Sequence, residues 1–269
     1  MTSNFDAALT SAPAPLERSP ARVFVLGDSL TYHGPDQAER PSDPRLWPQV
    51  MASELASTTG THSRSDLAAG LGWTARDGWW ALTKDPRCWG ELLPVADAVV
   101  VALGGMDQLP AAIPTYLREG IAVVRPGGLR RVVRRTYRTC APPIMRLTGG
   151  RLRQLPQAAT DRYLTRIVTA VRILRPDIPL LVLSPAPFRS RYYPTAAGHE
   201  PARAACREWA ERERVELLDL DPLVWPGIRA GTANPDGLHW GWDTHRAVGQ
   251  AVAQRLLTLA PTGPAEEFQ

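Results

Sequence analysis

Short apolar runs that alternate with amphipathic segments most limit the folds open to this chain. The strand-like runs cover residues 22–26, 62–67, 96–103, 179–183 and 215–218, and the amphipathic segments cover residues 46–57, 160–174, 201–214 and about 244–257. The run 96–103 is nearly all Val and Ala, which is typical of a central parallel strand. Strands separated by helices form βαβ units, so we expect an α/β fold with a parallel sheet between two helical layers.

Length and composition favour one main domain. A chain of 269 residues, 44% hydrophobic, can bury a single large core. We expect this domain to span residues 21–260, between a flexible Ala/Ser/Pro-rich leader at 1–20 and a short tail at 261–269. No run of about 18 apolar residues is present, so we expect no transmembrane helix. Three widely spaced cysteines favour a reducing compartment, and therefore the cytoplasm.

One segment, residues 109–155, interrupts the alternation. It is rich in Pro and Gly, and nine arginines lie between Arg125 and Arg153. Long connections in compact domains tend to be lids or binding segments, so we interpret it as an Arg/Pro/Gly-rich insertion of that kind. The net charge of +4 does not by itself indicate a nucleic-acid partner.

Three residues at opposite ends of the chain have the chemistry of a nucleophile, a base and an acid. Ser29 follows the first strand, where α/β sheets place reactive groups. Asp236 and His239 are three residues apart, so the carboxylate can orient the ring while the other ring nitrogen faces Ser29. The alternative is that Ser29 only caps the next helix and His239 is an ordinary loop histidine.

The sequences around these residues resemble the SGNH, or GDSL, hydrolase superfamily. Gly27-Asp28-Ser29-Leu30 resembles its first block and Asp236-Gly237-Leu238-His239 its last, and the resemblance spans roughly residues 22–257. It implies a flavodoxin-like, three-layer α/β/α sandwich with a five-stranded parallel sheet. It also implies that Ser29 is the nucleophile, His239 the general base and Asp236 its orienting partner.

The oxyanion donors implied by the resemblance are only partly present. The backbone N–H of Ser29 is one, and the second-block glycine is Gly70 or Gly72, of which we favour Gly70. The family's third block reads Gly-x-Asn-Asp, whereas this chain has Met106 at the asparagine position, before Asp107. A thioether cannot donate a hydrogen bond, so we infer a specialised branch of the family.

A narrower resemblance is to the actinobacterial diglucosylglycerate octanoyltransferases. It rests on Tyr32-His33-Gly34-Pro35, on the tryptophans after the second block, and on the lost asparagine. It implies transfer of an octanoyl group from a carrier such as acyl-CoA to a hydroxyl of a glucosylated glycerate, through an acyl-Ser29 intermediate, in methylglucose lipopolysaccharide synthesis. The candidate substrate-binding residues are Asp107, Trp73, Trp240, Arg131 and Arg135.

Two alternatives remain open at the level of sequence. One is a carboxylester hydrolase or acetylesterase acting on a sugar or small ester. The other is a non-catalytic carbohydrate-binding protein on the same scaffold, because Met106 breaks the oxyanion block. No cofactor is expected, and no metal site is suggested because His62, His199 and His245 lack ligand-like spacing with other donors.

Overall fold

The computed structural model describes residues 21–259, apart from the side chains of Tyr116 and Glu119, and is built on five parallel strands. These are β1 (Arg22–Gly27), β2 (Arg64–Ala69), β3 (Ala98–Ala102), β4 (Leu180–Leu183) and β5 (Glu216–Leu218). Their order, β2-β1-β3-β4-β5, confirms the predicted flavodoxin-like sheet. Each strand lies within a predicted run or within two residues of it. The predicted leader and tail lie outside the described residues.

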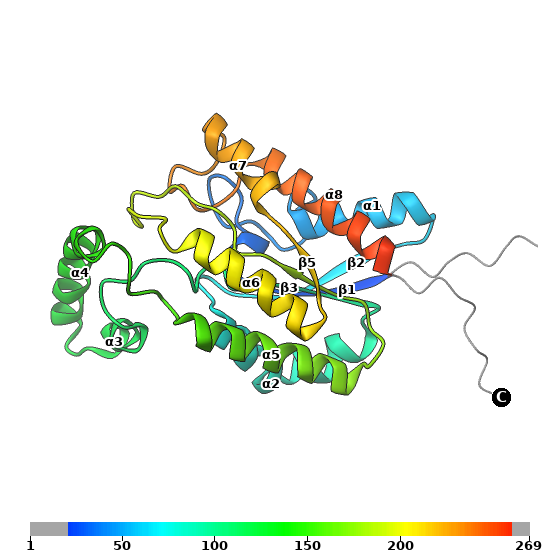
Figure 1. The fold of residues 1–269 in the computed structure, drawn as a ribbon, viewed down its shortest axis with the longest axis horizontal. Helices are drawn as coiled ribbons and strands as arrows, with labels where there is room; N and C mark the ends of the chain where they lie inside the picture. Colours follow the sequence, from blue (N-terminus) through cyan, green and yellow to red (C-terminus); the bar gives the residue numbers. More distant parts are fainter. Residues whose placement is uncertain (1–20, 260–269) are drawn as a thin grey trace, which may run out of the picture.

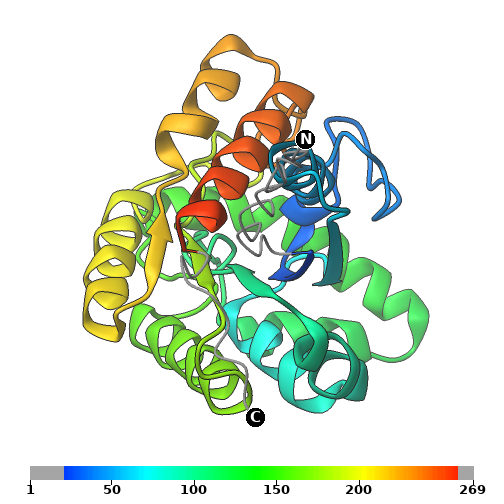
Figure 2. The same ribbon diagram turned by 90° about the vertical axis from the view of Figure 1, so that its right-hand side faces the viewer.

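Helices cover both faces of the sheet, as predicted (Figures 1 and 2). One layer contains α1 (Trp47–Thr59), α7 (Asp221–Ala230) and α8 (Trp242–Leu259), and the other contains α2 (Ala75–Lys84), α5 (Gln157–Leu174) and α6 (His199–Glu213). Shorter turns are η1 (Ser29–Thr31), the π-helical η2 (Cys88–Leu92) and η3 (Leu93–Val95). The sequence did not predict α2 or α7, which contain helix-disfavouring Gly78, Pro226 and Gly227 in their interiors.

The strands divide their side chains between two buried clusters. In β1, Val23 and Val25 pack beneath α1 and α8, whereas Phe24 and Leu26 pack against α2 and α5. All four side chains are at most 1% exposed. Successive strand residues point to opposite faces, so a strand buried on both faces needs a continuous apolar run. This requirement explains why the strands could be recognised from sequence.

The two ends of the insertion, residues 109–155, are hydrogen-bonded to each other. Near its ends, the Ala111 N–H donates to the Leu152 carbonyl at 2.7 Å, and the Gln154 N–H donates to the Leu109 carbonyl at 2.9 Å. Between these contacts lie α3 (Thr115–Gly120), η4 (Ile121–Val123) and α4 (Gly127–Leu147). Helices α3 and α4 stand at one end of the molecule (Figure 1). The insertion is therefore a helical segment whose two ends are held together by backbone hydrogen bonds.

Two isoleucines of α5 test the assignment of the core. Ile167 is fully buried, whereas Ile173 is 74% exposed. We expect Ile167→Ala to lower the free energy of unfolding by about 2–5 kcal/mol, because it leaves a cavity. Ile173→Ala should change it by no more than about 0.5 kcal/mol. Urea denaturation of both variants measures the difference, and similar losses would contradict the packing described.

Candidate active site

Ser29 stands at the carboxyl end of β1, on a turn that the sequence enforces. Asp28 caps this turn, and its Oδ1 accepts the Leu30 N–H at 2.9 Å. A Cβ on Gly27 would lie 2.1 Å from the Thr31 hydroxyl, so the chain can close this tightly only at glycine. The turn leaves Ser29 5% exposed at the wall of a cavity.

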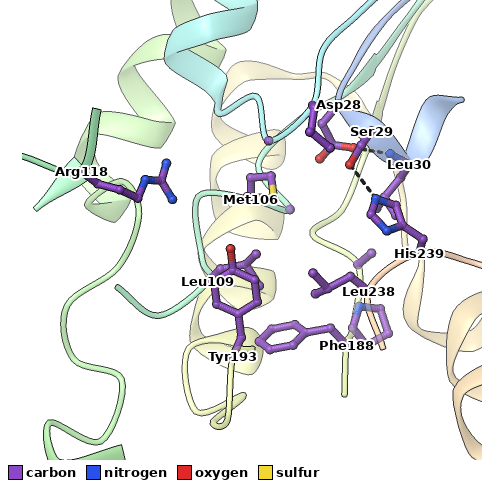
Figure 3. A pocket seen from close by; sticks show the side chains of 15 residues that line it. Asp28, Ser29, Leu30, Met106, Leu109, Arg118, Phe188, Tyr193, Leu238 and His239 are labelled. Carbon is purple, nitrogen blue, oxygen red and sulfur yellow. Dashed lines mark hydrogen bonds between the residues drawn. The ribbon is translucent and has the colours of Figure 1, made fainter. Parts of the chain in front are cut away.

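Ser29, His239 and Asp236 form a continuous hydrogen-bonded chain. Nδ1 of His239 lies 2.6 Å from Asp236 Oδ2, and Nε2 lies 2.9 Å from Ser29 Oγ (Figure 3). Burial acts to raise the pKa of Asp236, but hydrogen bonds from His239 and from the Leu238 and His239 N–H groups outweigh it and lower the pKa to about 2. The ionised carboxylate accepts the Nδ1 proton, which leaves Nε2 free to accept from the serine hydroxyl.

Gly237 makes the turn between the acid and the base possible. Its φ is +70°, and a Cβ at this position would lie 1.7 Å from the Arg189 carbonyl oxygen. The Gly237 carbonyl accepts the Arg189 N–H at 2.9 Å. The Asp236–His239 loop is therefore fixed against the segment that follows β4.

A second histidine lies against the first. The rings of His33 and His239 stack with centroids 3.6 Å apart and planes 17° apart. The His33 carbonyl accepts from His245 Nε2 at 3.1 Å, and Nδ1 of His245 accepts the Trp47 N–H at 3.2 Å. Burial lowers the pKa of His245 to about 4, so it is neutral at pH 7. Nothing in the local sequence around His33 signals this stack, because it depends on residues about 200 positions away.

An apolar pocket of about 290 Å³ opens beside Ser29. Its walls include Leu71, Met106, Leu109, Phe188 and Leu238, and Figure 3 shows most of these side chains around the cavity. Arg118 and Tyr193 add polar groups on the side away from the serine. The volume is at the small end of the ~300–1,000 Å³ usual for ligand sites, so it favours a short or medium apolar chain.

The structure favours a different second-block glycine from the one preferred on sequence. Gly72, with φ +70°, lines the pocket together with Ser29 and Met106, whereas Gly70 does not line it. A Cβ on Gly70 would lie 2.0 Å from Nε1 of Trp73, so this glycine serves close packing of the indole. Gly72 is therefore the better placed of the two candidates, and the choice of oxyanion donor stays a prediction.

The predicted substrate-binding residues do not line the pocket. Trp73 packs against the core beneath α2, and Trp240 is 2% exposed within the opposite core. Arg131 and Arg135 lie exposed on α4. The aromatic wall comes instead from Phe188 and Tyr193, and the cationic group from Arg118. Sequence could not separate Arg118 from its many neighbouring arginines.

Asp107 is also a structural residue in this arrangement. Its carboxyl group is buried and accepts the first N–H of α2, from Ala75, at 3.1 Å and the Thr160 hydroxyl at 2.9 Å. Burial is the main cause that raises its pKa to about 7, with a smaller contribution from Asp28. Both carboxyl oxygens face protein donors, so Asp107 joins the turn after β3 to α2 and α5.

Another buried histidine, His199, lies outside the pocket wall. Its Nε2 lies 2.8 Å from Asp221 Oδ1, and its Nδ1 lies 3.0 Å from Gln108 Oε1. In the described part of the chain, His199, Glu200 and Asp221 are the one group of side chains that could hold a metal ion. Arg203 lies 3.7 Å from the same Asp221 oxygen and supplies the positive charge there, so we interpret this group as a structural clamp.

A flavodoxin-like sheet with a serine, histidine and aspartate hydrogen-bonded at its carboxyl edge defines the class of serine-dependent acyl hydrolases and acyltransferases. The chain belongs to the GDSL-like Lipase/Acylhydrolase family, whose sequence profile matches residues 25–247. No helix in residues 21–259 is long and apolar enough to span a membrane.

Two relatives lie within this family. The chain is 40% identical over 240 residues to the diglucosylglycerate octanoyltransferase of Mycobacterium tuberculosis (strain ATCC 25618 / H37Rv), covering 89% of this chain and 93% of that protein. It is 40% identical over 235 residues to the diglucosylglycerate octanoyltransferase of Mycolicibacterium hassiacum, covering 87% and 94%.

Solved structures share the fold at low sequence identity. The lipase/acylhydrolase from Enterococcus faecalis superimposes with a TM-score of 0.58 at 15% identity, covering 91% of this chain and 99% of that one. Est24, a carbohydrate acetylesterase from Sinorhizobium meliloti, gives 0.57 at 17% identity, covering 88% and 99%. At these identities the likeness concerns the fold alone.

The raised pKa of Asp107 predicts a measurable pH dependence of stability. Because the folded pKa is above the ordinary value of 3.8, its contribution is complete below pH 3.8 and is lost as the pH rises through about 7. Asp107→Asn cannot ionise, so its stability relative to the wild type should increase between pH 4 and pH 8. Urea denaturation at several pH values tests this, and parallel curves would contradict it.

The stack of His33 on His239 gives a second prediction. Removal of the ring in His33→Ala should lower the rate of Ser29 acylation by about 2- to 10-fold, from the ~0.5–1.5 kcal/mol of a stacked aromatic pair. His33→Phe retains a flat ring and should restore most of the rate. Burst kinetics with an activated ester measure both, and equal rates in the two variants would contradict a role for the stack.

Proposed function

We propose that this protein is a serine acyltransferase that moves an octanoyl group from an acyl carrier such as acyl-CoA to a hydroxyl of a diglucosylglycerate-type acceptor. The observation that carries the proposal is the Ser29–His239–Asp236 chain beside an apolar pocket, in a protein 40% identical to two diglucosylglycerate octanoyltransferases. Residues 21–260 act as one catalytic domain. The three free cysteines favour the cytoplasm as its location.

The geometry supports a reaction in two half-steps. Ser29 Oγ attacks the carbonyl carbon of the octanoyl thioester while His239 Nε2 takes the hydroxyl proton. The C–S bond then breaks, the thiol leaves with that proton, and octanoyl-Ser29 remains. In the second half-step the acceptor hydroxyl gives its proton to His239, its oxygen attacks the ester, and Ser29 is regenerated. Asp236 holds the ring in position and stabilises its protonated form.

Two backbone N–H groups would stabilise the oxyanion in each half-step. We assign these to Ser29 and Gly72, which both line the pocket at the reacting centre. The Met106 side chain lines the same wall, but its thioether has no N–H or O–H to donate. Its side chain extends the apolar wall, which suits an alkyl chain better than an amide would.

Formation and discharge of an acyl-enzyme test the proposal. With octanoyl-CoA or p-nitrophenyl octanoate, intact-mass spectrometry should show one octanoyl group on the wild type and none on Ser29→Ala. Asp236→Asn should acylate about 10⁴-fold more slowly, since the imidazole is left in the wrong tautomer.

A chase then separates transfer from hydrolysis. Glucosylated glycerate should discharge the octanoyl-enzyme faster than water alone. Equal discharge by water would identify a carboxylester hydrolase. Absence of an adduct with every donor, while glucosylglycerate still binds, would identify a carbohydrate-binding protein on this scaffold.

A further inference from the structure

Arg118 is the one basic side chain of Lys or Arg type that lines the pocket, among the residues that the structure describes. It lies on α3, close to the anchored base of the insertion at Leu109. Figure 3 shows its guanidinium pointing into the cavity from the side opposite Ser29 and His239. The insertion therefore delivers a permanent positive charge to the site through α3, and not through the arginine-rich α4.

Within the described part of the chain, no carboxylate lies within 4.0 Å of the Arg118 guanidinium. Two other partly buried arginines are paired with carboxylates, Arg22 with Asp66 and Arg203 with Asp219. Three more donate to neutral oxygens instead, namely Arg153, Arg172 and Arg175. The pocket's own acidic group, Asp28, is engaged with the Leu30 N–H near Ser29. A partly buried cation in a mainly apolar wall is unfavourable unless an anion accompanies it.

A tyrosine hydroxyl faces the same cavity as this cation (Figure 3). Tyr193 lines the pocket, and Arg118 opposes the effect of burial, which raises the pKa of Tyr193. Burial likewise raises the pKa of Tyr137 of α4, and Arg118 opposes this effect. These phenols remain protonated at neutral pH and can donate hydrogen bonds. A planar guanidinium with a nearby phenol O–H matches the two oxygens of a carboxylate.

We propose that Arg118 and Tyr193 form a subsite that binds the carboxylate of the acyl acceptor. This inference rests on the proposed function, and it divides the pocket in two. Leu71, Met106 and Leu238 receive the octanoyl chain next to Ser29, while the acceptor's glycerate end lies toward Arg118. A sugar acid is then selected over a neutral glycoside of similar size.

The phosphates of an acyl-CoA donor are the other possible source of anionic oxygen. In acyl-CoA, however, the thioester that reacts at Ser29 is separated from the phosphates by the whole pantetheine arm. Ser29 and Arg118 line one pocket, so an anion at Arg118 lies closer to the reacting carbonyl than phosphates at the far end of an extended pantetheine arm would lie. The carboxylate of glycerate lies within the acceptor itself, so the geometry favours the acceptor.

The experiment compares the wild type with Arg118→Gln, and uses Arg138→Gln, an exposed arginine of the same insertion, as the matched control. Each enzyme is acylated with uncharged p-nitrophenyl octanoate and then chased with glucosylglycerate or with neutral glucosylglycerol. We expect Arg118→Gln to lower kcat/KM for glucosylglycerate by about 10- to 100-fold, the range for a charged hydrogen bond. The value for glucosylglycerol should change by less than about threefold, and Arg138→Gln should resemble the wild type.

Acylation by octanoyl-CoA forms a separate arm. If Arg118→Gln slows acylation by octanoyl-CoA but not by p-nitrophenyl octanoate, and transfer to glucosylglycerate is unaffected, Arg118 binds the donor and the carboxylate assignment is overturned. Equal losses with glucosylglycerate and glucosylglycerol would also overturn it, because they would show a structural role. Arg118→Lys, which retains the charge but not the planar fork, should fall between the wild type and Arg118→Gln.

Direct binding separates this inference from the proposed function. Calorimetric titration of the Ser29→Ala variant with glucosylglycerate measures binding without turnover. The double variant Ser29→Ala/Arg118→Gln should bind glucosylglycerate at least about 10-fold more weakly than Ser29→Ala alone. If the wild type does not transfer octanoyl groups but Arg118→Gln still weakens glucosylglycerate binding, the proposed octanoyltransferase function is refuted and the carboxylate subsite is supported. Unchanged binding, with transfer intact in the wild type, would refute the subsite alone.

Discussion

The hydrogen bond between Ser29 and His239 joins residues 210 positions apart, and the remainder of the site is arranged around it. It can form only because β1 lies inside a parallel sheet, between β2 and β3, with its carboxyl end at the edge where the later loops also arrive. The buried Val and Leu residues of β1 fix that position. The Gly27 turn and the Gly237 turn then bring the two side chains within bonding distance from opposite ends of the chain.

Buried polar groups hold the floor of this site in one conformation. Asp28 and Asp107 are both nearly inaccessible, and burial raises the pKa of the first to about 6 and of the second to about 7. Each carboxyl group accepts backbone N–H groups of the turn or helix that it supports. Such groups reduce the freedom of the loops that carry Ser29 and the pocket wall.

The α/β sheet with its loops and the insertion contribute different parts of the site, which explains how one family fold could bind a particular acceptor. The sheet and its loops supply the nucleophile, the base and the apolar wall. The insertion adds α3 and α4, and through α3 it adds the cation that the scaffold lacks. Recognition of the acceptor can therefore change without disturbing the hydrogen-bonded chain at Ser29.

The sequence by itself determined the sheet, the layers and the identity of the three hydrogen-bonded residues, because doubly buried strands require continuous apolar runs and because Ser29, Asp236 and His239 lie in short local motifs. Only the tertiary structure decided what surrounds them. The position of Gly72 on the pocket wall, the ring of His33 against His239, and the position of Arg118 in the pocket depend on contacts between distant segments. Local sequence patterns do not predict such contacts. The fold decides whether a given side chain lies in the core, on the surface or in the pocket, and residues of one type cannot be distinguished in this respect from sequence alone.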